Sequence, residues 1–202
     1  TNTRKADRQR VVAALKNIAE GTDLADSMDI DNLLRYMAVH VFSVNEDSLS
    51  GSMAHNYYLY ESGGKLNLIP WDYNLALGGM GGMGGGMPGG SGETEEGSGA
   101  TSVVNSPIDD AFSGTDFFDT LLENETYHSQ YEAYLQQLVS EYINGGGFDA
   151  FYERVRSQID ELVETDPTAF YSYDEYETAA ETLYQVVKLR GQSIQGQLDG
   201  TI

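Results

Sequence analysis

A glycine-rich stretch between residues 78 and 106 divides the sequence into two parts. The residues before and after it must together form the hydrophobic core. The stretch begins GGMGGMGGGMPGGSGETEEGSGA. It has too few bulky side chains to offset the entropy lost on ordering, so we expect a flexible Gly/Met-rich insert over residues 79–106. Residues 79–84 match the spacing G-x-G-x-x-G, but no strand and following helix frame them as a phosphate-binding loop requires.

Before the insert, the spacing of apolar residues predicts two helices and a β-hairpin. Residues 7–20 and 29–44 repeat apolar side chains every three to four positions, as an amphipathic helix does. Strands are predicted over residues 55–61 and 65–70, joined by a turn at Ser62-Gly63-Gly64.

After the insert, the pattern is helical to the end. The predicted helical segments are residues 117–122, 127–142, 148–162 and 172–198. Three glycines at 145–147 and Pro167 separate the last three segments, and Ser172 with Glu175 forms a capping-box pattern. Together these patterns predict one domain over residues 1–202, of the α+β class and mostly α, with a small β-hairpin.

Charge and composition exclude several classes of function. The chain has 11 Lys and Arg against 32 Asp and Glu, a net charge of −21, which argues against binding nucleic acid. The absence of cysteine excludes disulfides, thiolate catalysis and cysteine-zinc sites. No window is long and apolar enough to predict a membrane span. Acidic residues beyond position 109 are interpreted as solubilising surface charge.

Neither the histidines nor the common catalytic motifs indicate a catalytic or metal site. His40, His55 and His128 fall in separate predicted elements, so no metal cluster is predicted from them, and His40 and His128 are interpreted as ordinary helix residues. The sequence contains no Gly-x-Ser-x-Gly, His-Glu-x-x-His or Gly-Lys-Ser/Thr motif.

Small oxygen-bearing side chains are concentrated around the predicted hairpin. Asp47 lies in the polar loop before it and Asn56 at its start, while Asp72 and Asn74 follow its end. Magnesium prefers hard oxygen ligands, and protein kinases use an aspartate, an asparagine and, after a short hairpin, a second aspartate in this order. Ordinary turn residues are the alternative, because Asp and Asn are frequent in turns.

The absence of Lys and Arg around Asp72 limits how a phosphate could bind there. No basic residue occurs between Lys65 and Arg154. A phosphate near Asp72 would therefore require a divalent cation or basic side chains from elsewhere.

Two segments, NEDSLSGSMAHNYYLY and KLNLIPWDYNLALGG, resemble the signature of the CotH family, the spore coat protein H-like atypical protein kinases. The closing LRGQSIQGQL, residues 189–198, also resembles the family's C-terminal part, so the resemblance covers most of the chain outside the insert. It implies a fold like the C-terminal lobe of a protein kinase, with the hairpin at the catalytic cleft. It also implies transfer of phosphate from ATP to serine or threonine of protein substrates, with Mg²⁺ or Mn²⁺.

The resemblance also implies roles for individual residues. Asp47 would be the catalytic aspartate that orients or deprotonates the substrate hydroxyl. Asn56 and Asp72 would bind the metal, together with Asn74, which stands where the family often has a second acid. His55 and Trp71 would frame the cofactor site.

Further expectations concern the rest of the protein and its setting. Only 46 residues precede Asp47 and they read as helices, so we expect the nucleotide-covering lobe to be missing from this chain, which alone would be inactive. The resemblance implies a bacterial protein outside the cytoplasm, at the cell surface or spore coat, acting on serine-containing proteins.

Two other functions remain as alternatives to a kinase: a non-catalytic coat or surface assembly module and, with less support, a calcium-binding module. No Asp-x-Asp-x-Asp-Gly loop is present for the latter, and no oligomeric state is predicted.

Overall fold

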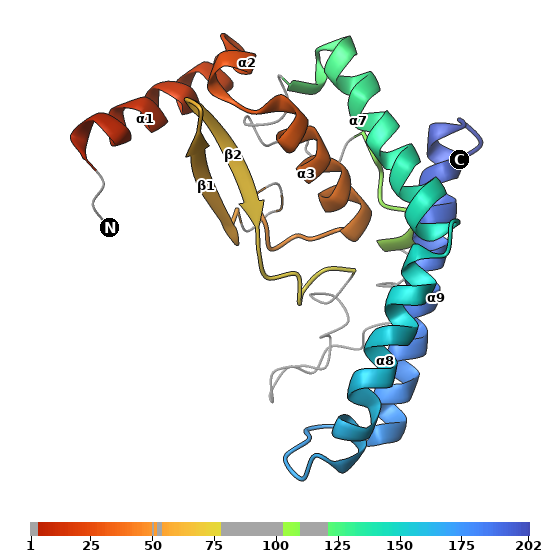
Figure 1. Cartoon of the computed structure of the whole chain (residues 1–202). Coiled ribbons are helices and arrows are strands. Elements are labelled where there is room, and N and C mark those ends of the chain that lie inside the picture. Colours follow the sequence, from red (N-terminus) through yellow and green to blue (C-terminus); the bar gives the residue numbers. More distant parts are fainter. Residues whose placement is uncertain (1–3, 50, 52–53, 78–102, 110–120) are drawn as a thin grey trace, which may run out of the picture.

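The computed structural model describes residues 4–49, 51, 54–77, 103–109 and 121–202. In this part of the chain helices predominate, and the one sheet is a two-stranded antiparallel hairpin (Figure 1). The predicted α+β, mostly α class is confirmed. Most of the predicted insert, and most of the short helix predicted over residues 117–122, lie outside the described residues.

Among the described residues, five helices lie at nearly the predicted positions, and the short helix α2 was not predicted. In chain order the elements are α1 (Lys5–Ala19), α2 (Leu24–Ser27), α3 (Ile30–Ser43), β1 (Tyr57–Ser62), β2 (Lys65–Pro70), α7 (Glu125–Gln137), η2 (Leu138–Ile143), α8 (Gly147–Thr165) and α9 (Tyr173–Leu198). The η2 segment is a π-helix that continues α7. The capping box predicted for Ser172 and Glu175 is confirmed at the start of α9.

The first strand begins two residues later than predicted. Asn56 has a φ of +53°, in the left-handed region, which is incompatible with an extended strand. Strand β1 therefore begins at Tyr57, and His55 and Asn56 belong to the loop before it.

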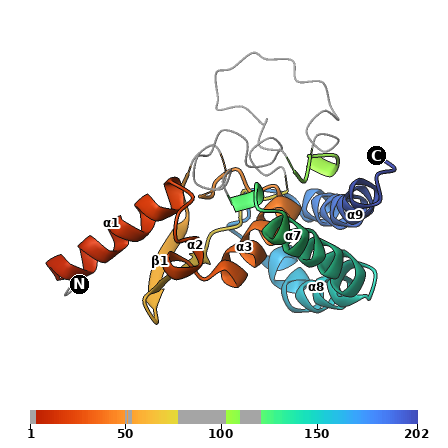
Figure 2. The same cartoon turned by 90° about the horizontal axis from the view of Figure 1, so that it is seen from above.

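Helix α3 lies at the centre of the core. Its residues Leu33, Leu34 and Met37 are at most 1% exposed. They belong to the same buried cluster as Leu66 and Leu68 of β2 and several side chains of α7 and α9. The hairpin lies between α1 and α3 (Figures 1 and 2).

The side chain of Asn32 fastens the hairpin to α3. Its amide nitrogen donates to the Leu68 carbonyl at 3.3 Å, and its amide oxygen accepts from the Leu68 N–H at 2.8 Å. This pair of hydrogen bonds satisfies the N–H and carbonyl of Leu68 on the outer edge of β2, where another strand would otherwise pair. On the other side, Arg10 of α1 forms an ion pair with Glu61 of β1.

A fully buried arginine, Arg190, joins α9 to the end of α3. Its guanidinium donates to the carbonyls of Val41 (2.9 Å) and Phe42 (3.4 Å) in the last turn of α3. It also donates to Val104 (3.1 Å) and Ser106 (2.5 Å) of the segment 103–109. The carbonyl end of a helix attracts positive charge, which helps to accommodate the buried guanidinium here. Burial lowers the pKa of Arg190 to about 10, so it stays charged near neutral pH.

Helices α8 and α9 form a long antiparallel hairpin that extends away from the core (Figure 1). Among the described residues, no helix has both the length and the apolar character needed to cross a membrane.

Candidate functional site

The loop after α3, which carries Asp47, is held by its own backbone. Ser48, which is 1% exposed, donates from its hydroxyl to the Asn45 carbonyl at 2.7 Å. The Ser48 carbonyl in turn accepts from the His55 N–H at 3.1 Å. These contacts hold Asn45, Ser48 and His55 close together, with Asp47 half-buried beside them.

Two hydrogen bonds connect this loop with the end of the hairpin. The Asn56 side-chain amide donates to the backbone carbonyl of Asp47 at 3.1 Å. The Asn56 carbonyl accepts from the Trp71 N–H at 3.2 Å. Asp47, Asn56 and the segment containing Asp72 are therefore brought together by the fold, although 25 positions separate the first from the last.

Left-handed backbone conformations are concentrated in the same region. Of the six non-glycine residues with positive φ in the described part of the chain, five lie in or beside these loops: Val44, Ala54, Asn56, Asp72 and Leu77. Asn and Asp tolerate this conformation better than other side chains, whereas Val44 is β-branched and strained there. Such strain tends to occur at functional sites, where the surrounding structure enforces it.

Tyr73 anchors the segment that carries Asp72 and Asn74. Its hydroxyl lies 3.4 Å from His40 Nδ1, and His40 Nε2 lies 3.4 Å from the Tyr36 hydroxyl within α3. Burial lowers the pKa of His40 to about 4 and raises that of Tyr73 to about 12, so both are neutral near pH 7. With Tyr73 packed inward, Asp72 and Asn74 on either side of it remain exposed.

The predicted metal ligands keep oxygen atoms free of protein partners. In the described part of the chain, no hydrogen bond or ion pair engages the carboxylates of Asp47 and Asp72 or the side chain of Asn74. Asn56 uses its amide nitrogen, which leaves its amide oxygen available. His55 is exposed, and its side chain makes no described contact with the other predicted site residues.

An aromatic surface lies next to Asp72 on the outer face of the hairpin. Trp71 is 51% exposed, and its ring centroid lies 6.2 Å from that of Tyr58, which is 59% exposed. Tyr58 pairs directly with Ile69 across the two strands, and Ile69 is also exposed. Tyr58 and Ile69, neighbours of Trp71 on this surface, were not singled out from the sequence.

Sequence reasoning missed three contributors to this arrangement. His40 was interpreted as an ordinary helix residue, and Tyr73 was not assigned a role. Asn45 is 4% exposed, and its amide oxygen accepts from the Asp47 N–H at 3.2 Å, while its amide nitrogen has no partner among the described residues. The Asn-x-Asp spacing was the available signal for Asn45, whereas the contact between His40 and Tyr73 depends on the fold.

Comparison with models of protein families gives one match. The family described as CotH kinase protein matches residues 1–194 of the 202-residue chain. A search of curated proteins found no match.

Proposed function

Because this chain belongs to the CotH kinase protein family, we propose that the protein is an atypical protein kinase that transfers phosphate from ATP to serine or threonine of proteins. The observation that carries the proposal is the hydrogen bond from the Asn56 amide to the Asp47 carbonyl. It supports the proposal because it holds side by side the residues proposed as the catalytic aspartate and a metal-binding asparagine, two residue types that protein kinases carry on one catalytic loop.

The side chains at the hairpin exit fit a hard divalent cation. Asn56, Asp72 and Asn74 offer amide and carboxylate oxygens that have no protein partner among the described residues. Mg²⁺ or Mn²⁺ is suited to such a set, which leaves ligand positions for phosphate oxygens and water. When bound, the cation neutralises charge on the β- and γ-phosphates.

Asp47 would act on the protein substrate. Its carboxylate accepts the proton of the substrate hydroxyl as the hydroxyl oxygen bonds to the γ-phosphorus and the bond from that phosphorus to ADP breaks. The hydrogen bonds from Asn56 to the Asp47 carbonyl and from Asp47 N–H to Asn45 hold the aspartate backbone on both sides. This fixed backbone favours a constant position for the carboxylate during transfer.

The nucleotide base would lie on the aromatic surface formed by Tyr58, Ile69 and Trp71. This surface adjoins Asp72 in the chain and is exposed. Because no Lys or Arg occurs between Lys65 and Arg154, the cation and other parts of the protein would supply the positive charge around the phosphates.

A phosphate-transfer assay tests the proposal. The protein from the complete open reading frame is incubated with radiolabelled ATP, Mg²⁺ and a serine-rich protein, alongside its Asp47→Ala and Asp72→Ala variants. We expect transfer by the unmodified protein and a loss of about a hundredfold or more in each variant, because each removes a group that acts at the reacting phosphate.

The matched control is Asp174→Ala, an exposed aspartate in the first turn of α9, which should transfer phosphate normally. Phosphate transfer that survives Asp72→Ala at full rate contradicts the proposed role of this site.

The alternative is a non-catalytic assembly module with the same fold. Asn74 favours it, because a neutral amide contributes less to cation binding than the acid often found at this position in the family. Calorimetry on the full-length protein distinguishes the two, since Mg²⁺-dependent binding of ATP is expected only for the kinase.

A further inference from the structure

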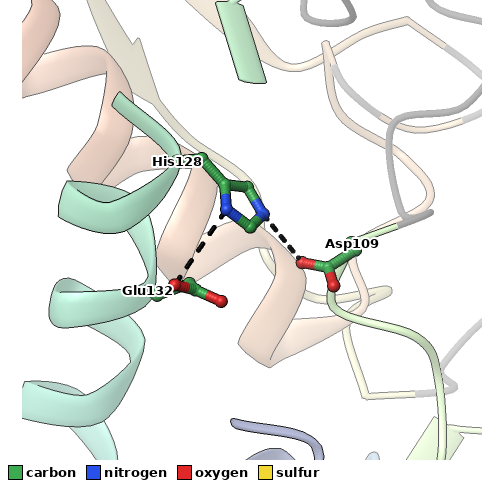
Figure 3. A group of neighbouring side chains, drawn as sticks. All are labelled: Asp109, His128 and Glu132. Carbon is green, nitrogen blue, oxygen red and sulfur yellow. Dashed lines mark hydrogen bonds and ion pairs between the residues drawn. The ribbon is translucent and has the colours of Figure 1, made fainter. Parts of the chain in front are cut away.

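Asp109, His128 and Glu132 form a second group of potential metal ligands, separate from the hairpin (Figure 3). An Asp109 carboxylate oxygen lies 3.2 Å from His128 Nε2, and a Glu132 oxygen lies 4.0 Å from His128 Nδ1. One ligand atom from each residue lies within 4.8 Å of the other two. Neither carboxylate forms an ion pair with Lys or Arg in the described part of the chain.

The core fixes the backbone on both sides of this group. His128 and Glu132 are one turn apart on α7 and so share a face of the helix. Asp109 follows Ile108, whose N–H donates to Gln197 Oε1 at 3.0 Å and whose carbonyl accepts from the Tyr131 hydroxyl at 2.8 Å. Ile108 and Tyr131 are 3% and 0% exposed, so the position of residue 109 relative to α7 is set by buried contacts.

Charge and exposure favour a cation at this position. With His128 neutral, the group carries two negative charges, and the chain has a net charge of −21. The side chains of His128, Glu132 and Asp109 are 33%, 40% and 60% exposed, which leaves them accessible to an ion from solvent. From the sequence, Glu132 was interpreted as solubilising surface charge and Asp109 had no assigned role.

We propose that Asp109, His128 and Glu132 bind a divalent transition metal, with Zn²⁺ as the representative ion. One imidazole nitrogen with two carboxylates is a ligand set that suits Zn²⁺ and its neighbours, whereas Mg²⁺ and Ca²⁺ prefer oxygen alone. Water completes the coordination. The bound ion fastens the segment 103–109 to α7.

Binding requires a small rearrangement of exposed side chains. Zinc bonds to nitrogen and oxygen measure about 2.0–2.2 Å, which places tetrahedral ligand atoms roughly 3.4 Å apart. The two carboxylates face different ring nitrogens of His128, so one of them has to swing to the other's side. Asp109, the most exposed of the three, is free to do so by rotation of its side chain.

Calorimetric titration of the full chain with Zn²⁺ alone, in a buffer that does not bind metal, tests the proposal. We expect one Zn²⁺ per chain, and an affinity lowered about tenfold or more by His128→Asn and by Asp109→Asn. Zn²⁺ should also raise the Tm of the unmodified protein and not that of His128→Asn, because binding to the folded state stabilises it. His128 is partly exposed, so circular dichroism without metal should confirm that His128→Asn is folded.

Two controls separate this site from its surroundings. Glu164→Gln, at an exposed position on α8, removes one negative charge and should leave Zn²⁺ affinity unchanged. Asp72→Ala should also bind Zn²⁺ at the Asp109, His128 and Glu132 group normally, whatever its effect on phosphate transfer. The proposal is overturned if the unmodified chain does not bind Zn²⁺, or if His128→Asn binds it as tightly as the unmodified chain.

Discussion

At the scale of single residues, the candidate kinase site combines a firmly held backbone with side-chain oxygens left free. Asn56 shows both properties, because its amide nitrogen is bonded to the Asp47 carbonyl while its amide oxygen remains available. Asn56 and Asp72 have left-handed φ values, a conformation that Asn and Asp adopt more readily than most other residues. The backbone therefore favours these residue types independently of their proposed role as ligands. Residue type and order indicated Asp47, Asn56 and Asp72 as candidate site residues, whereas the contact between Asp47 and Asn56 could be found only from the fold.

Asn74 provides a test of how charge limits cation binding at this site. Replacing it by aspartate adds one negative charge at an exposed position, where a unit charge about 4 Å from another contributes about 1 kcal/mol in water. We therefore expect Asn74→Asp to bind Mg²⁺ several-fold more tightly, and calorimetry on the full-length protein measures this.

The matched control for that experiment is Asn67→Asp on β2, which changes the net charge equally but lies within the hairpin. An equal gain in both variants would show that the effect comes from overall charge and would contradict a ligand role for Asn74.

At the scale of elements, periodic patterns predicted the helices well and the contacts between them poorly. The spacing of apolar residues is repeated along each helix, so α3, α8 and α9 could be placed from sequence. The start of β1 was misplaced because a single left-handed residue, Asn56, interrupts an otherwise strand-like segment. Arg190 had no recognisable partner in the sequence, because its partners are backbone carbonyls, which every residue has.

The buried guanidinium of Arg190 is expected to be essential to the attachment of α9. Arg190→Ala would remove the guanidinium donors of the Val41, Phe42 and Val104 carbonyls, and each bond to a charged group is worth about 1.5–3 kcal/mol. We expect the free energy of unfolding to fall by about 3 kcal/mol or more, measured by urea denaturation.

Arg190→Lys should restore only part of that stability, because one ammonium group cannot reach carbonyls on two segments as the planar guanidinium does. Arg154→Ala, at an exposed position on α8, is the control and should change the free energy by less than about 0.5 kcal/mol. Similar losses in Arg190→Ala and Arg154→Ala would refute the assigned role.

At the scale of the whole molecule, acidic residues outnumber basic ones by 32 to 11, and only some of the basic residues form ion pairs in the described part of the chain. Arg10 pairs with Asp7 and Glu61, Arg156 with Asp160, and Lys188 with Asp149. The remaining negative charges repel one another in the compact state more than in the unfolded chain. Composition predicted this excess of charge, but not which acids are paired.

Salt is therefore expected to stabilise the folded chain. Raising NaCl from about 0.02 to 0.3 M shortens the screening length from roughly 20 Å to under 10 Å, which weakens the repulsion between distant carboxylates. The urea concentration at the midpoint of unfolding should rise, and urea is the suitable denaturant because it adds no ions. A triple variant, Glu153→Gln, Glu161→Gln and Glu164→Gln, removes three exposed charges from α8 and should show a smaller rise. A midpoint that falls with salt would mean that the specific ion pairs of Arg10, Arg156 and Lys188 outweigh the general repulsion.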